Sequence, residues 1–406
     1  MAIISFLLGS GFSIPEGLPS VRQLNKRMGK IHESEILIHT DEHAMFLNGQ
    51  NDPNRWSRKH ERLFLQEFLE FYNNEVIDNP DHFHYETFYD FYSGYLRERE
   101  NNDLIEKFNI EFNSRYFKGS QPTRNCRSRI EDFNRSFNQL LGSQLHNKKY
   151  FEDVGISGHY PYNPFFRFIG DLLRDHNIKV HTLNHDLFFD WVGRHHSDLF
   201  EHFSDGFELA GSPFYGSLIH DFRNGNEIVH KSYKVKLERY TGIYDGKLSL
   251  FKLHGSIFNK IIYRNNEAVR IKSNYAISSY LEEVFNDETN KHEFQHTWDD
   301  VSPDFLSGTT EKTIRYVEDE YYVNLFNHFE RNLQQSEILI VIGYGFQDPG
   351  INEYLTQHFL SKGKKMVVID PYKPKTDLID KYKAVYIPHG VDQISYQDYS
   401  KLNPIQ

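Results

Sequence analysis

The chain has 406 residues, which allows one large domain or two to three smaller ones. It carries 57 acidic and 46 basic side chains, and this net charge of −11 argues against a dedicated nucleic-acid groove. The single cysteine, Cys126, excludes a disulfide framework and a cysteine-based zinc site, and favours a reducing cytoplasmic setting. The first residues lack the basic segment of a signal peptide, and no apolar run approaches the roughly 18 residues of a membrane span.

The first third of the chain begins with an apolar run and continues as a polar, aromatic region. Ile3 to Leu8 is short, continuous and apolar, which predicts a strand buried on both faces of a parallel sheet. From about Ser20 to Leu145 we find helical periodicity and no convincing buried strand. We therefore expect residues 31–160 to form a mainly helical insertion, with loops at Asn48 to Arg58 and Arg97 to Asp103.

The rest of the chain alternates predicted helices and strands. The expected helices are Pro164 to Arg174, Glu318 to Gln335 and Pro349 to Leu360. The expected strands are Ile178 to Leu183, Leu248 to Leu253, Ile338 to Ile342, Lys365 to Ile369 and Ala384 to Ile387. Residues 257–313 are polar and predict a second, irregular insertion. This alternation predicts an α/β fold with a Rossmann-like, doubly wound parallel sheet formed by residues 1–30 and 161–406.

Small or polar residues follow the carboxyl ends of five predicted strands. They are Gly9, Asn184, His254, Gly343 and Asp370. Open α/β sheets bind their ligands at that edge, so these positions predict a binding site.

Each of these signals has a second interpretation. Gly9-Ser10-Gly11-Phe12-Ser13 follows a strand and can bring backbone N–H groups to a pyrophosphate, but an ordinary tight turn explains it equally well. Asn184 and Asp186 follow the strand that contains Thr182, and can point into one cleft or cap the next helix. His254 can transfer a proton near neutral pH, although one histidine among 22 is weak evidence alone.

Other histidines suggest a metal only weakly, because none joins a second ligand cluster at the spacing of a metal site. These groups are His82 with His84 and Glu86, His195 with His196, and His292 with His296. We expect no metal.

Together the motifs resemble those of the sirtuin superfamily, which includes protein deacylases and sirtuin-like NAD⁺ hydrolases of bacteria. The family's G-A-G-x-S and G-I-P-D-F-R are similar to Gly9-Ser-Gly-Phe-Ser13 and Gly17-Leu-Pro-Ser-Val-Arg22. Its T-Q-N-I-D and L-H-G match Thr182-Leu-Asn-His-Asp186 and Leu253-His-Gly255. Gly343-Tyr-Gly-Phe-Gln-Asp348 resembles a segment common in the sirtuin-like proteins of bacterial defence systems. The resemblance covers about half of the chain.

The resemblance implies a sirtuin-like fold and a role for each matched residue. Asn184 would bind the nicotinamide ribose or position a water, Asp186 would recognise the carboxamide, and His254 would act as general base. Arg22 would lie near the same ribose, and Asp370 at the adenine-side ribose. The residues expected to bind NAD⁺ are Gly9, Ser10, Gly11, Phe12, Ser13, Arg22, Thr182, Gly343, Gly345, Asp348 and Asp370.

The chain departs from the family in two ways. It lacks the four cysteines of the sirtuin zinc module, and Ser20 and Val21 replace the family's Asp and Phe beside Arg22. Both differences weaken the case for acyl-lysine chemistry and leave NAD⁺ cleavage intact. We therefore expect an NAD⁺ hydrolase that cleaves the nicotinamide–ribose bond and releases nicotinamide and ADP-ribose.

By the same resemblance, the protein would be a cytoplasmic effector that depletes NAD⁺ during phage infection. It would act as a homo-oligomer, or with a HerA-type ATPase or an Argonaute-like protein, without contacting nucleic acid or membrane itself. Two alternatives remain open. One is an NAD⁺-dependent deacylase or ADP-ribosyltransferase, and the other is a non-catalytic module that senses NAD⁺ or ADP-ribose.

Overall fold

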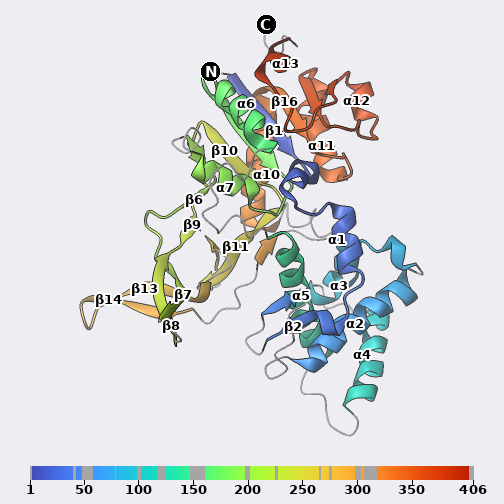
Figure 1. Cartoon of the computed structure of the whole chain (residues 1–406), viewed down its shortest axis with the longest axis vertical. Coiled ribbons are helices and arrows are strands. Elements are labelled where there is room, and N and C mark those ends of the chain that lie inside the picture. The colour runs from blue at the N-terminus through green and yellow to red at the C-terminus, as the bar shows by residue number, and fades with distance from the viewer. Residues whose placement is uncertain are drawn as a thin grey trace. The chain divides into compact units, whose positions relative to one another are not determined.

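A computed structural model describes most of the chain, namely residues 2–39, 43–47, 58–77, 79–97, 102–117, 125–146, 161–196, 202–224, 227–264, 267–273, 277–297, 303–305 and 318–401. The chain divides into two compact units (Figure 1). The first comprises Met1–Phe12, Lys149–Phe305 and Asn324–Gln406, and the second comprises Ser13–Lys148 and Leu306–Val323. Residues 13–30, which we expected in the α/β core, belong to the second unit.

The first unit is built on a seven-stranded parallel sheet with the order β18-β17-β16-β1-β4-β10-β5. Its strands are β1 (Ala2–Leu8), β4 (His176–Thr182), β5 (Phe203–Ser204), β10 (Leu248–Lys252), β16 (Ser336–Ile342), β17 (Lys365–Ile369) and β18 (Val385–Ile387). The chain leaves β1 towards β4 and later places β16 on the other side of β1. The strand order therefore reverses between β1 and β16.

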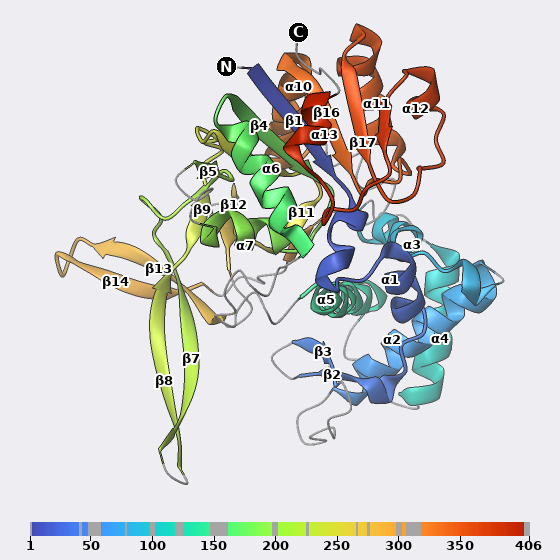
Figure 2. The ribbon, with the colours of Figure 1, turned by 45° about the horizontal axis from the view of Figure 1, so that its top comes forward.

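Helices cover both faces of this sheet. The helices of the unit are α6 (Asn163–Leu173), α7 (Phe188–His195), α10 (Glu320–Gln335, whose first residues belong to the second unit), α11 (Pro349–His358), α12 (Leu378–Lys381) and α13 (Tyr396–Lys401). The Phe6 ring of β1 lies 6.1 Å from that of Phe168 in α6, and the His181 ring of β4 lies 4.8 Å from that of Phe329 in α10. Because His181 pairs with Leu7 in register, it points to the face opposite Phe6. Figure 2 shows α6 in front of the sheet and α10 behind it. The predicted doubly wound α/β fold is confirmed.

Two antiparallel sheets complete the first unit, with the orders β15-β11-β12-β9-β6 and β14-β13-β7-β8. Their strands are β6 (Phe207–Glu208), β7 (Phe214–Asn224), β8 (Glu227–Lys236), β9 (Glu238–Tyr240), β11 (Gly255–Arg264), β12 (Glu267–Lys272), β13 (Ile277–Asn286), β14 (Lys291–His296) and β15 (Pro303–Phe305). The prediction of an irregular insertion at residues 257–313 is therefore wrong for its described part, and β6 to β9 were not predicted.

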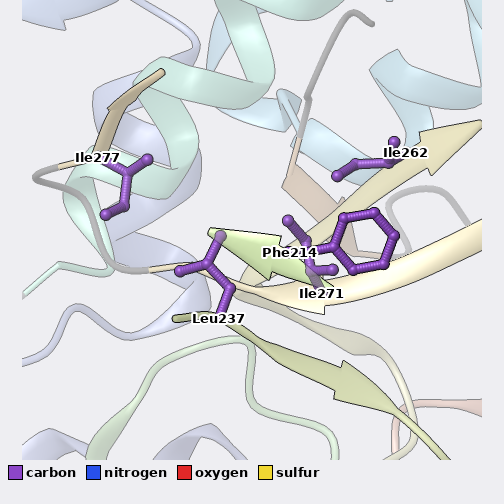
Figure 3. Packing of buried hydrophobic residues seen from close by; sticks show 5 residues of the cluster. All are labelled: Phe214, Leu237, Ile262, Ile271 and Ile277. Atoms are coloured by element: carbon purple, nitrogen blue, oxygen red, sulfur yellow. The ribbon is translucent and has the colours of Figure 1, made fainter. Parts of the chain in front are cut away.

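The cause of that error is visible in β12. Val269 and Ile271 alternate there with Arg270 and Lys272, so a strand with one apolar face has a polar average composition. Ile271 packs in an apolar cluster with Phe214, Leu237, Ile262 and Ile277, which Figure 3 shows at close range. The partners come from distant segments, and no local pattern could reveal them.

The second unit is mainly helical, as predicted. Its helices are α1 (Val21–Met28), α2 (Lys59–Phe71), α3 (Tyr85–Arg97), α4 (Asp103–Tyr116) and α5 (Cys126–Gln144). Aromatic rings form its core, with Phe68 lying 5.0 Å from Phe133 and 5.2 Å from Phe108. Two short strands, β2 (Ile36–Ile38) and β3 (Ala44–Phe46), were not predicted, since three residues are too few to show a period. Their outer residues are buried, whereas Met45 in the middle of β3 is exposed. The two predicted loops fall mostly outside the described residues.

No helix among the described residues is long and apolar enough to cross a membrane.

Candidate functional site

The carboxyl ends of five adjacent strands carry the five positions that the sequence predicts for a binding site. In the sheet order β17, β16, β1, β4 and β10, these strands lead into Asp370, Gly343, Gly9, Asn184 and His254. Neighbouring strands lie about 4.8 Å apart, so the five positions line one edge of the sheet. The reversal of strand order between β1 and β16 lies within this edge, where open α/β sheets bind ligands.

The loops after β1 and β16 touch each other through their glycines. The Gly9 N–H donates to Ile342 O and the Gly11 N–H to Gly343 O, both at 3.0 Å. A Cβ on Gly9 would lie 2.5 Å from Gly343 O, and a Cβ on Gly343 would lie 2.2 Å from Phe12 N. We call this contact the glycine junction, and it consists of Gly9, Gly11 and Gly343. The Phe12 N–H also donates to Gly9 O, so three of the five N–H groups in Gly9 to Ser13 bind protein carbonyls. The tight-turn interpretation thus accounts for the N–H groups of Gly9, Gly11 and Phe12, and a phosphate role for the turn stays a prediction.

Phe12 anchors the glycine turn in the core. Its side chain is 1% exposed, and its ring lies 5.0 Å from that of Phe165 and 5.4 Å from that of Tyr162. The Tyr162 hydroxyl donates to Phe12 O at 2.5 Å. The Phe12 ring is therefore part of the core and is not available to a ligand. Ser10, two residues earlier, is exposed.

Ser13 and Arg22, the other two residues that the resemblance assigns to NAD⁺, belong to the second unit. There Ser13 is buried and Arg22 is exposed on α1. Their roles remain predictions.

Asn184 links the exit of β4 to the glycine turn. Its side-chain Nδ2 donates to Gly9 O at 2.9 Å, and its main-chain N–H donates to Thr182 Oγ1 at 3.1 Å. Asp186 is buried, and its Oδ1 accepts the Phe188 N–H at 3.0 Å where α7 begins. This bond forms a turn directly before α7, whose N-cap is Leu187 without a side-chain cap, and the role of Asp186 towards a carboxamide stays a prediction.

His254 meets Asp348 at the same edge. The His254 Nε2 lies 3.5 Å from Asp348 Oδ2, with 5% and 20% of the two side chains exposed. Asp348 also caps α11, since its Oδ1 accepts the Ile351 N–H at 3.1 Å, and this bond holds the carboxylate in place. Gly255, at φ +78°, lets the chain turn directly after His254. A carboxylate beside an imidazole orients the ring and stabilises its protonated form, so this pair can accept and release a proton.

The loop between Gly343 and Asp348 is ordered by a buried tyrosine. The Tyr344 hydroxyl lies 3.2 Å from Asp348 O and 3.0 Å from Asn352 Oδ1. Burial, with the nearby Asp348 carboxylate, raises the pKa of Tyr344, which keeps the hydroxyl protonated as a donor. Gly345 in the same loop is exposed, and a Cβ there would meet only Gln347 Cγ at 3.7 Å. A methyl group at Gly345 would therefore cause no clash, in contrast to one at Gly343.

Asp370 follows β17, next to β16 in the sheet. Its Oδ1 accepts the Tyr372 N–H at 2.9 Å in a local turn. Burial raises the pKa of Asp370, and this backbone hydrogen bond partly opposes the shift. A carboxylate at this place can accept hydrogen bonds from the hydroxyls of a ribose.

Two groups near this edge were missed from the sequence. His185 is 8% exposed, and its ring lies 6.1 Å from that of His254. Lys252, two residues before His254, is buried and bonded to Asp190. His185 stands inside the Thr182-to-Asp186 motif and could have been noticed there, whereas no sequence pattern distinguishes Lys252 from the other lysines.

Within the described ranges, no three or more His, Cys, Asp or Glu side chains are grouped so that they could hold a metal ion. His292, one of the candidate histidines, has its Nδ1 3.8 Å from Glu283 Oε1.

No protein-family model and no curated protein matches this sequence. A solved complex of a Sir2 homologue with NAD is similar over 99% of this chain and 91% of its own, with 10% sequence identity and a TM-score of 0.37. A mutant Sir2 homologue with 2′-O-acetyl ADP-ribose is similar over 96% of this chain and 88% of its own, with 12% identity and a TM-score of 0.35. At scores this low, the α/β assignment rests on the strand order itself.

Proposed function

We propose that the protein hydrolyses NAD⁺ at the nicotinamide–ribose bond and releases nicotinamide and ADP-ribose. The observation that carries this proposal is the grouping of the glycine junction, Asn184 and the His254–Asp348 pair at one edge of the sheet. A dinucleotide bound to a doubly wound sheet lies across the point where the strand order reverses, which is where this group stands.

The residues at this edge fit the parts of NAD⁺. The Asp370 carboxylate can accept hydrogen bonds from the adenine-side ribose hydroxyls, and the exposed backbone at Gly345 permits close approach of a ligand. Asn184 is held by Gly9 O, so its amide is fixed at the exit of β4, where it can orient a water or a hydroxyl of the nicotinamide ribose.

The chemistry needs few groups because the leaving group is already cationic. Cleavage of the nicotinamide–ribose bond passes through an oxocarbenium-like state, as in glycoside hydrolysis. The bonding electrons return to the nicotinamide nitrogen, and a water oxygen forms the new bond to the ribose carbon. His254 accepts the proton that this water loses, and Asp348 stabilises the charge that then develops on the imidazole. Asn184 orients the water.

The resemblance to the sirtuin-like defence proteins supports a role in NAD⁺ depletion during phage infection. We also propose that the protein forms a homo-oligomer or a complex with a partner protein, and that this assembly restrains its activity. Unrestrained NAD⁺ cleavage would harm the cell that produces the enzyme. The aromatic part of the second unit beyond Arg22 is not covered by the motifs.

The test is turnover by purified protein, with products separated by chromatography. We expect Asn184→Ala and His254→Ala each to lower kcat by about 10²-fold, since one preorganised polar contact contributes about 3 kcal/mol in a dry site. The melting temperature should change little. The matched control is His292→Ala, because His292 is an exposed histidine whose side chain is 62% accessible.

Three outcomes would contradict the proposal. Unchanged turnover in both variants would remove these residues from the chemistry. Cleavage that requires an acyl-lysine peptide would indicate a deacylase, and ADP-ribose attached to protein would indicate a transferase.

A further inference from the structure

A buried row of alternating lysines and aspartates lies next to the site. Lys252 Nζ donates to Asp190 Oδ2 at 2.8 Å, and Lys272 Nζ donates to Asp190 Oδ1 at 3.1 Å and to Asp205 Oδ2. We call these four residues the Lys–Asp row. Each of the four side chains is only 6–8% exposed, so the charges are largely removed from water.

The row joins four separate segments of the first unit. Lys252 ends β10 of the parallel sheet, Asp190 lies in the first turn of α7, and Lys272 ends β12 of the antiparallel sheet. Asp205 stands between β5 and β6. The two positive and two negative charges balance.

One end of the row touches the site. Besides Asp190, Lys252 Nζ donates to the main-chain carbonyl of Asp186. Asp186 is two residues beyond Asn184, and Lys252 is two residues before His254. A single ammonium group therefore ties the loop after β4 to the end of β10, which are the two segments that carry the proposed catalytic residues.

Stability alone does not explain such a row. Burying paired charges gains little net free energy, and apolar residues of similar size often replace a buried pair without loss. What a buried ion pair can supply is one defined arrangement of the segments it joins. An apolar residue in place of Lys252 could fill its volume, but could not donate a hydrogen bond to the Asp186 carbonyl.

We propose that Lys252, oriented by Asp190, is a positioning residue that sets the distance between Asn184 and His254. Lys272 and Asp205 complete the charge balance farther from the site. This inference rests on the proposed function, because it concerns the residues assigned to NAD⁺ cleavage.

Two double variants test the proposal, since each removes one lysine and one aspartate and leaves the remaining pair intact. Lys252→Met with Asp190→Leu removes the donor to Asp186, while Lys272→Met with Asp205→Leu keeps it. We expect the first to lower kcat for NAD⁺ at least tenfold with less than a twofold change in KM. Turnover by the second should stay within twofold of the wild type. Lys252→Arg, which keeps the charge and the donors, should recover part of the lost turnover.

Hydrogen exchange supplies a readout that does not depend on activity. In the first double variant, amides of residues 183–188 should exchange at least tenfold faster, while those of β1 exchange as in the wild type. Equal loss of turnover and equal exchange in both double variants would show that the row is only structural, and would refute the proposal. Full turnover and unchanged exchange in the first double variant would also refute the positioning role of Lys252. The proposed NAD⁺ hydrolysis would be unaffected by that result. If the wild type releases no nicotinamide, the proposed function fails and the exchange result alone decides.

Discussion

Two glycines of one loop, Gly343 and Gly345, should differ strongly in how much stability the same alanine substitution costs. In Gly343→Ala the new methyl group would lie 2.2 Å from Phe12 N and 2.5 Å from Gly11 C, backbone atoms that cannot rotate away. Gly343 also has φ +62°, where an L side chain costs about 1–2 kcal/mol. Overpacking adds about 1–3 kcal/mol, so we expect the free energy of unfolding to fall by about 2–5 kcal/mol.

Gly345→Ala is the matched control, because its methyl group would meet only Gln347 Cγ at 3.7 Å. The change in unfolding free energy should stay within about 0.5 kcal/mol. If Gly345 admits the ligand as proposed, the KM for NAD⁺ rises in this variant while its stability is unchanged. Urea denaturation, monitored by circular dichroism, measures the free energy of unfolding of both variants. A difference of less than about 1 kcal/mol between the two variants would refute the argument that backbone contact at the junction requires Gly343.

Two further predictions concern pH and metal. Burial lowers the pKa of His181 from 6.5 to about 3, and its neighbours suit the neutral ring, since Nδ1 lies 3.1 Å from Phe6 O and Nε2 lies 3.1 Å from Asn332 Nδ2. The unfolded chain thus binds a proton that the native state excludes. The free energy of unfolding should therefore fall by about 1.4 kcal/mol per pH unit as the pH drops below 6.5. His181→Gln should lack this contribution in urea titrations at pH 7 and pH 5, and an identical pH dependence would contradict the argument. NAD⁺ cleavage should persist after exhaustive EDTA treatment, because the cationic leaving group needs no Lewis acid, whereas stoichiometric zinc with unfolding on its removal would overturn that expectation.

The sequence by itself determined the parallel sheet and the residues at its edge. Runs such as Ile338 to Ile342 are apolar throughout because strands of a doubly wound sheet are buried on both faces, and this property is local. The residue that follows such a run lies at the carboxyl end of the strand by geometry alone. The positions of Gly9, Asn184, His254 and Asp370 along one edge could therefore be predicted without coordinates.

Only the tertiary structure decided which of these residues touch and which have other tasks. It paired His254 with Asp348, assigned Phe12 to the core, and showed that Gly343 is required by the backbone of a distant loop. It also brought Lys252 against Asp186, although the two are far apart in the chain. A sequence pattern carries information about a residue and its near neighbours in the chain. Contacts between distant segments depend on the strand order and on how loops fold over the sheet edge. Packing between distant segments also decides which polar side chains are buried, such as Arg270 and Lys272 at the end of β12.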